Sequence, residues 1–366
     1  SAGLSMFTTW TRVKVRTSSS ARRNATRSSV RAARPAASQS VCDSCVVKPR
    51  VVIVSPASAS ANNGNWHTAT RWARFLSRDY AVKVVERWSR ADSPPDVMVA
   101  LHARRSADSL QQFRRLRARG GLLLALTGTD VYRDIHDDDA AKRSLQLADR
   151  IVVLQPRALD ELTAAARIKA SVVYQSAHAL KPGTRSNRFF DVVQVGHLRH
   201  EKDPFTPITA LRHLPPESRI RLTQIGTALD AQHSDAMAVV TRDEPRLHWL
   251  GGLAHAMTRQ RIKRAHLLVI ASRMEGGANV IVEAVTAGVP VLASDISGNI
   301  GMLGEHYPGL FPLGDAPACA AMMRRAEVDH RFYGRLVRAA AQRAKYFEPD
   351  REAESIRGAV ARVLTM

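Results

Sequence analysis

The chain has 366 residues, of which 45% are hydrophobic and 24% charged, a composition typical of globular rather than fibrous or disordered proteins. This length suits two domains of about 150 residues each. No apolar run approaches the ~18 residues of a membrane helix, and three cysteines are too few for a disulfide-stapled secreted scaffold. Lys and Arg number 54 against 33 Asp and Glu, a net charge of +21 that favours an anionic partner.

Residues 1–49 are expected to form a disordered basic extension. The segment 6–41 is rich in Arg, Ser and Ala, contains no acid and shows no periodic apolar face. Its composition resembles an organellar transit peptide, although an unstructured extension or residues upstream of the natural start would look the same. We therefore expect a cytoplasmic protein, or an organellar one if this segment is a targeting signal. Cys42 and Cys45 form a lone C-x-x-C with no second pair of ligands, so no zinc site is expected.

Residues 50–182 alternate between apolar runs and helical periodicities. Val51–Val54 is a continuous apolar run, as in a strand buried on both faces of a parallel sheet, and a helical pattern through Trp66 and Leu76 follows it. Further strands are predicted at 82–85, 97–101, 122–126, 150–154 and 170–174, with helices such as 106–119 and 140–148 between them. The pattern predicts a doubly wound, Rossmann-like domain.

The polar segment Lys181–Arg188 contains Pro and Gly and is interpreted as an interdomain linker. The alternation then restarts over residues 188–331, with strands at 190–195, 220–225, 247–250, 267–270 and 290–293. Residues 332–366 are helical and basic, and are expected to pack back on the N-terminal domain. Two such α/β domains should face a central cleft, because ligands bind beyond the carboxyl ends of parallel strands.

The strongest motif runs from Ala271 to Ser294 and is predicted to be a strand, a glycine loop, a helix and a second strand. Glu275 lies in the loop and Glu283 about one turn into the helix. Between them, the N–H groups of 276–279 open a helix, where free donors and the helix dipole favour a phosphate. Glu283 is suited to bind ribose hydroxyls and Glu275 a sugar hydroxyl.

This motif resembles the donor site of glycosyltransferases with the GT-B fold, in particular the large retaining family four, where two glutamates separated by seven residues precede Ala-x-x-x-Gly-x-Pro-Val. Residues 195–204 resemble a second signature of that family, Val-Gly-Arg-Leu followed by Lys. Lys202 matches it, but His197 replaces the arginine, so Arg199 or Arg273 would have to compensate. The resemblance implies that a nucleotide sugar is bound by Gly196, His197, Arg199, Lys202, Arg273, Gly276, Gly277, Ala278, Asn279 and Glu283.

Several segments resemble, in their detailed sequence, the selenosugar synthases of selenoneine biosynthesis. These segments are 51–76, 100–105, 127–134, 195–204, 249–252, 258–268 and 273–284. That resemblance covers about residues 49–325. It implies UDP-N-acetylglucosamine as the donor, selenophosphate as the selenium source and a carbon–selenium bond formed at the anomeric carbon.

The N-terminal domain is then expected to bind the acceptor. Asn63, Gly64 and Asn65 follow the first strand and could form a nest of backbone donors for an anion, or a plain polar turn. Arg104, Arg105 and Arg133 offer planar guanidinium groups to phosphate or selenophosphate oxygens. His102 and Asp130 follow predicted strands and are candidate catalytic residues together with Glu275.

No cofactor or metal is expected. Asp137–Asp139 contains an Asp-x-Asp, but it precedes a predicted helix, where acids suit the helix dipole. Two alternatives to the selenosugar synthase remain open: an ordinary UDP-sugar-dependent glycosyltransferase with a hydroxyl acceptor, and, more remotely, a nucleic-acid-binding protein. The second lacks zinc spacing, a helix-turn-helix pattern and aromatic-rich strands, since aromatic residues are only 5%. Inversion or retention at the anomeric carbon and the oligomeric state stay undecided.

Overall fold

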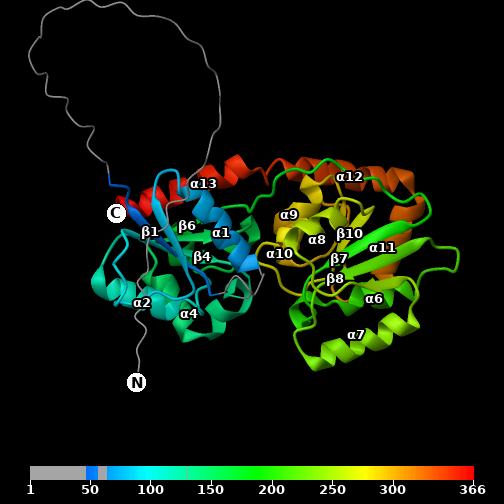
Figure 1. The fold of residues 1–366 in the computed structure, drawn as a ribbon, viewed down its shortest axis with the longest axis horizontal. Coiled ribbons are helices and arrows are strands. Elements are labelled where there is room, and N and C mark those ends of the chain that lie inside the picture. The colour runs from blue at the N-terminus through cyan, green and yellow to red at the C-terminus, as the bar shows by residue number, and fades with distance from the viewer. Residues whose placement is uncertain (1–46, 57–63, 129) are drawn as a thin grey trace, which may run out of the picture. The chain divides into compact units, whose positions relative to one another are not determined.

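The computed structural model describes residues 47–56, 64–128 and 130–366. The expectations for the basic extension, for Cys42 and Cys45, and for Asn63 lie outside these residues. The described chain contains two six-stranded parallel sheets with helices between the strands, which confirms the α/β class predicted from the sequence (Figure 1).

The first sheet has the strand order β2-β1-β3-β4-β5-β6. Its strands are β1 (Arg50–Val54), β2 (Ala81–Val85), β3 (Val97–Leu101), β4 (Leu122–Leu126), β5 (Arg150–Val153) and β6 (Ala170–Val172). Side chains along each central strand alternate between two separate cores: Val51 and Ile53 belong to one, Val52 and Val54 to the other. The continuous apolar runs are therefore needed, because both faces of the sheet are covered.

The two faces of the first sheet are covered by helices from different parts of the chain. One face is covered by α2 (Ala107–Leu116) and α4 (Asp139–Leu147), and the other by α1 (Gly64–Leu76) together with the chain's last helix, α13 (Pro349–Leu364) (Figure 1). Shorter elements complete the domain: a π-helical turn (Asp130–Asp134), α3 (Ile135–Asp137), a 3-10 turn (Pro156–Leu159) and α5 (Ala164–Ile168).

The second sheet has the order β12-β11-β10-β7-β8-β9. Its strands are β7 (Phe190–Val195), β8 (Ile220–Ile225), β9 (Leu247–Trp249), β10 (Leu267–Ile270), β11 (Val291–Ser294) and β12 (Leu310–Phe311). The accompanying helices are a 3-10 turn (His200–Lys202), α6 (Phe205–Leu211), α7 (Ala231–Asp243), α8 (His255–Ile262), α9 (Asn279–Thr286), α10 (Ser297–Leu303) and α11 (Ala316–Val328). No regular element lies between β6 and β7, where the sequence predicts the linker.

The C-terminal segment divides its contacts between the two domains. Phe332, Leu336 and Ala340 of α12 (His330–Ala344) belong to the core of the second domain. Ile356 and Val360 of α13 belong instead to the core on one face of the first sheet. The return to the first domain is therefore made by α13 alone, and not by the whole of residues 332–366 as the sequence suggests.

Glu352 fixes α13 to α1. Its side chain is fully buried and accepts hydrogen bonds from Arg71 Nε (2.7 Å), Trp72 Nε1 (2.7 Å) and both the N–H and the hydroxyl of Ser176. A buried carboxylate is stable only when it is paired and hydrogen-bonded in this way. The network holds α1, whose first turn lies at the candidate site, against the segment that leaves the first sheet.

Candidate functional site

The strand orders place the expected site loops together at one position in each sheet. In the first sheet β1 lies beside β3, and in the second β7 lies beside β10. From the two strands of each pair, the chain continues toward opposite edges of the sheet. Such switch points are where open parallel sheets bind ligands. His102 follows β3 directly, whereas residues 196–204 and 271–278 follow β7 and β10. The two motifs predicted to bind the donor are therefore brought together by strand order.

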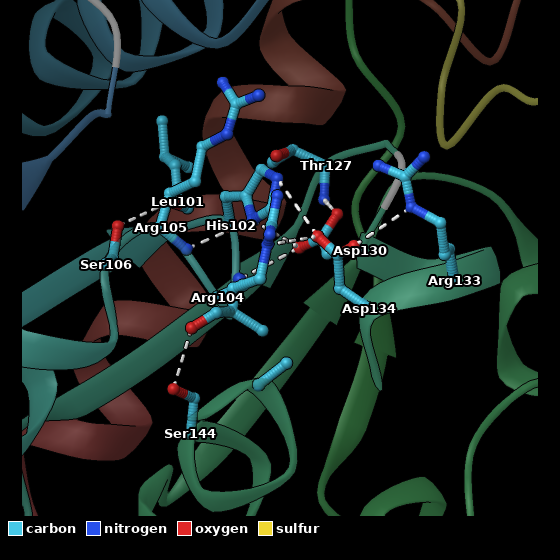
Figure 2. Close-up of polar contacts among 12 residues, drawn as sticks. Leu101, His102, Arg104, Arg105, Ser106, Thr127, Asp130, Arg133, Asp134 and Ser144 are labelled. Carbon is cyan, nitrogen blue, oxygen red and sulfur yellow. Dashed lines mark hydrogen bonds and ion pairs between the residues drawn. The ribbon is translucent and has the colours of Figure 1, made fainter. Parts of the chain in front are cut away.

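His102, drawn in Figure 2, has a strained backbone and a buried ring. Its φ is 74°, a left-handed conformation uncommon for residues other than glycine, and it is 3% exposed. Nδ1 accepts the N–H of Arg105 at 3.4 Å, whereas Nε2 has no hydrogen-bond partner among the described residues. Burial lowers the pKa of the imidazole. At neutral pH His102 is therefore an uncharged ring, and its buried Nε2 lies 3.7 Å from Oδ2 of Asp134. Backbone strain of this kind is common at functional sites.

Asp130 connects the loops that follow β3 and β4. It is fully buried; Oδ2 accepts the N–H of Ala103 at 3.0 Å and Oδ1 the N–H of Thr127 at 2.9 Å (Figure 2). Both oxygens are thus used to hold backbone in place. This geometry favours a positioning role for Asp130 over the direct catalytic role that the sequence suggests.

Asp134 lies between two of the predicted acceptor arginines, as Figure 2 shows. Its Oδ2 is 3.2 Å from Nε of Arg104, and its Oδ1 is 3.2 Å from Nε of Arg133. Asp134 is buried, but the two arginine side chains are 43% and 46% exposed. Since the carboxylate contacts only the Nε of each guanidinium, it leaves their terminal nitrogens for another anion. The sequence analysis missed Asp134, although its spacing of four residues from Asp130 puts the two acids on one helical turn.

Arg133 also extends toward the second domain. Its Nη1 is 3.7 Å from Oε1 of Glu201, in the 3-10 turn that follows β7. The third arginine, Arg105, is exposed, and its backbone N–H rather than its guanidinium contacts His102. The structure therefore gathers Arg104 and Arg133 around one carboxylate and leaves Arg105 beside them.

Lys202 and Glu275 come from different motifs and form an ion pair. The same Glu275 oxygen accepts the hydroxyl of Ser272 at 2.6 Å. Lys202 and Ser272 also line a small cavity beside Gly196, at the carboxyl end of β7. The lysine expected at the donor diphosphate and the glutamate expected at the sugar thus share one charge-paired unit.

His197 does not replace the family arginine electrostatically. Nδ1 accepts the N–H of Thr227 at 3.3 Å, and burial, followed by the nearby cations Arg199 and Lys202, lowers the pKa of the ring. His197 is consequently neutral at pH 7. The positive charge at this loop comes from Lys202, from the exposed Arg199, and from Arg273, whose Nη2 is 3.0 Å from Oδ2 of Asp203.

Gly276 and Gly277 lie where the predicted donor loop meets the first domain, and there is no room for a side chain at either position. A Cβ on Gly276 would lie 2.5 Å from N of Gly128, and one on Gly277 would lie 2.6 Å from Cβ of Leu154. Side chains there would displace backbone or packed atoms of the first domain. The resemblance implies that these glycines bind the nucleotide sugar, and the structure adds a close approach by the first domain.

The start of α9 retains the features expected of an anion site. Ala278 precedes the helix and makes no side-chain cap, so the first N–H groups of α9 receive no capping oxygen from it. Asn279 begins the helix opposite Gly64 of α1: a Cβ on Gly64 would lie 3.3 Å from Asn279 Nδ2. Gly64 and Asn65, predicted as acceptor residues, lie in the first turn of α1, and Gly64 lies beside the start of α9.

Glu283 points from α9 toward α8. Its Oε1 is 2.7 Å from Nε2 of His255, whose ring lies against that of His67 in α1. The sequence analysis identified neither histidine, because they lie far from Glu283 in the chain and carry no motif of their own.

Within the described ranges, no group of three His, Cys, Asp or Glu side chains is arranged to hold a metal ion. Of the three consecutive aspartates, Asp138 caps α4 by accepting the N–H of Ala141 at 2.9 Å. Nor does that part of the chain include a helix both long and apolar enough to cross a bilayer.

Comparison with known proteins identifies this architecture. Residues 180–343 match the family Glycosyl transferases group 1. None of the curated proteins matches the sequence at a significant level.

Solved structures resemble the whole described fold. HepE from Anabaena, in complex with UDP, shares 16% identity and a TM-score of 0.68, over 86% of this chain and 100% of HepE. Sucrose-phosphate synthase from Thermosynechococcus elongatus shares 16% identity and a TM-score of 0.69, over 87% and 99% of the two chains. A glycosyltransferase from Rickettsia africae shares 12% identity and a TM-score of 0.66, over 87% and 99%. These similarities confirm the expected GT-B fold.

Proposed function

Residues 180–343 match the family Glycosyl transferases group 1 in a chain of GT-B fold, and from this premise we propose that the protein is a UDP-sugar-dependent selenosugar synthase. In this reaction a sugar passes from UDP, with UDP-N-acetylglucosamine as the expected donor, to the selenium of selenophosphate. The observation that carries the proposal is the contact of the donor loop at Gly276 with the loop at Gly128, beside the two arginines held by Asp134.

The donor half of the proposal rests on charge and on the start of α9. Lys202, Arg199 and Arg273 lie on the loops after β7 and β10, and the uncapped N–H groups of α9 follow. Such donors stabilise the negative charge that develops on a departing diphosphate. In support, the structurally similar HepE has been crystallised with UDP and with UDP-glucose.

The acceptor half rests on the arginines. Arg104 and Arg133 present their terminal nitrogens from one side of the site while Asp134 holds each Nε. Guanidinium groups recognise phosphorus oxyanions by paired hydrogen bonds. A phosphate-class acceptor such as selenophosphate suits this arrangement, because its oxygens can bond to the terminal guanidinium nitrogens while Asp134 holds each Nε.

The proposed chemistry needs little proton transfer. The selenium lone pair attacks the anomeric carbon, the bond from that carbon to the UDP oxygen breaks, and UDP leaves with the electron pair. The first product carries phosphate on selenium, and water can then cleave the selenium–phosphorus bond to release the selenol and inorganic phosphate. His102 would assist by helping to orient Asp134, since Nε2 of its neutral ring lies 3.7 Å from Oδ2 of the carboxylate that holds the two arginines.

Mass spectrometry of products tests the proposal. The purified chain is incubated with UDP-N-acetylglucosamine, with and without selenophosphate, and both UDP and sugar products are quantified. A selenium-containing sugar that requires both substrates is the expected result. UDP release to hydroxyl acceptors, without any selenium product, would instead favour an ordinary glycosyltransferase.

A further inference from the structure

Three side chains from three helices form a continuous contact at the donor site. Nε2 of His255, the first residue of α8, is 2.7 Å from Oε1 of Glu283 in α9. The ring of His255 in turn lies against the ring of His67 in α1, with centroids 4.6 Å apart and planes inclined by 33°. Glu283 belongs to the second domain and His67 to the first.

The hydrogen bond between His255 and Glu283 has a defined donor and acceptor. The Glu283 side chain is 12% exposed and that of His255 45%. An ionised carboxylate can only accept, so Nε2 of His255 donates the hydrogen bond. Burial is the main cause that lowers the pKa of His67, which leaves an uncharged ring against His255.

The position of His67 is fixed by the rest of the fold. Arg71, one helical turn further along α1, is hydrogen-bonded to the buried carboxylate of Glu352 in α13. At the start of the same helix, Gly64 approaches Asn279 at the start of α9. The first turn of α1 is thus held from both ends against the helices that carry His255 and Glu283.

We propose that His255 is a positioning residue for the nucleoside ribose: it holds Glu283 so that the carboxylate can accept the ribose hydroxyls, and His67 holds His255. This inference rests on the proposed UDP-sugar function. The hydrogen bond from His255 uses Oε1 of Glu283 and leaves Oε2 for a hydroxyl. Without that bond the glutamate would have to lose side-chain freedom on binding, which weakens affinity. Ribose recognition therefore depends on a residue of the first domain as well as on the second.

Calorimetric binding of UDP and of 2′-deoxy-UDP tests this assignment. Wild-type protein should prefer UDP, because Glu283 accepts from the 2′-hydroxyl, and Glu283→Ala should lower UDP affinity about ten- to hundredfold, as expected when a charge-assisted hydrogen bond is lost. His255→Ala should also lower UDP affinity, about tenfold, with much less effect on 2′-deoxy-UDP. His255→Gln, which keeps a side-chain donor, should restore part of the preference.

Two further variants separate positioning from general packing. His67→Phe retains an aromatic ring against His255 and should preserve the preference for UDP, whereas His67→Ala should reduce it. His330→Ala, at an exposed histidine of α12, is the matched control and should bind both ligands as wild type does.

The result that overturns the inference is a His255→Ala variant that loses affinity equally for both ligands, or that keeps wild-type discrimination. If the wild-type protein binds UDP and the His255→Ala variant gives either of these results, only the positioning role is overturned. A wild-type protein that binds neither ligand would overturn the proposed function together with it.

Discussion

The ammonium group of Lys202 and the carboxylate of Glu275 form an ion pair, although the sequence assigns one to the diphosphate and the other to the sugar. Lys202 follows β7 and Glu275 follows β10, so the pair bridges the two strands at the switch point of the second sheet. Their side chains are 21% and 8% exposed. Each group therefore helps to orient the other before any substrate arrives.

We predict that Lys202→Ala weakens UDP-sugar binding and also destabilises the protein. The change removes a cation from the proposed donor site and leaves Glu275 hydrogen-bonded to the hydroxyl of Ser272. An under-satisfied buried group costs about 1–3 kcal/mol of unfolding free energy. Urea denaturation and steady-state kinetics measure the two effects. The double variant Lys202→Ala/Glu275→Gln should recover stability without recovering activity; simple additivity of the two losses would contradict the coupling.

Replacement of the acceptor arginines should affect selenophosphate and not UDP. Arg104→Ala and Arg133→Ala each remove a guanidinium that Asp134 orients, and we expect the KM for selenophosphate to rise about tenfold or more, since a hydrogen bond to a charged group is lost. Arg105→Ala should have a smaller effect. Kinetics with selenophosphate varied at saturating UDP-sugar give these constants, and calorimetry with UDP is the control. If all three variants keep wild-type kcat and KM, the acceptor anion binds elsewhere, with the start of α1 as the next candidate.

Gly276→Ala should reduce turnover, because the added methyl group would prevent the close approach of the two domains at this loop. The added Cβ would lie 2.5 Å from N of Gly128 and 2.7 Å from its Cα, and backbone cannot give way as a flexible side chain can. The donor loop and the loop after β4 must therefore move apart. Gly334→Ala is the matched control, because there the Cβ meets only the end of Arg338, 3.4 Å away, within a helix that favours Ala over Gly. Equal activity of both variants would show that the close approach is not needed.

His102 should make stability depend on pH. Burial lowers the pKa of its folded-state ring below the ordinary value of 6.5, so the unfolded chain binds a proton more readily. The contribution of the neutral, buried ring to the free energy of unfolding is complete above pH 6.5. It is lost as the pH falls through the folded-state pKa. Urea denaturation of His102→Asn between pH 7.5 and 5.5 should show a shallower loss of stability than wild type, and Asn tolerates the left-handed backbone. An identical slope in both proteins would mean that His102 does not carry this linkage.

Glu352→Ala should be among the most destabilising single substitutions in this chain. It removes a fully buried carboxylate and leaves Arg71, the Trp72 indole and Ser176 without their acceptor. Loss of one partner from a buried ion pair costs about 3–5 kcal/mol of unfolding free energy. Glu354→Ala, at an exposed position of the same helix, should change it by less than about 0.5 kcal/mol. Thermal and urea denaturation of the two variants distinguish a required anchor from a dispensable one.

Local pattern was sufficient to predict the two sheets. Val51–Val54 and Leu122–Leu126 are continuous apolar runs, and strands buried on both faces leave little choice of residue type at any position. The helix starts and the glycine loop after β10 could also be predicted, because caps, glycines and helix periodicity are patterns of only a few neighbouring residues. Short elements were not: β12 has two residues, and the turn at Asp130–Asp134 takes its form from buried contacts of Asp130 and Asp134.

The sequence therefore singled out the two predicted donor motifs and the arginines, but not how they meet. Whether Lys202 pairs with Glu275, or Asp134 with both Arg104 and Arg133, depends on strand order and on the packing of loops distant in the chain. The same holds for His67, His255 and Glu283, which lie on three different helices. Tertiary structure alone decides such pairs, because a side chain's partners at a sheet edge are set by which strands are neighbours and not by which residues are adjacent in the chain.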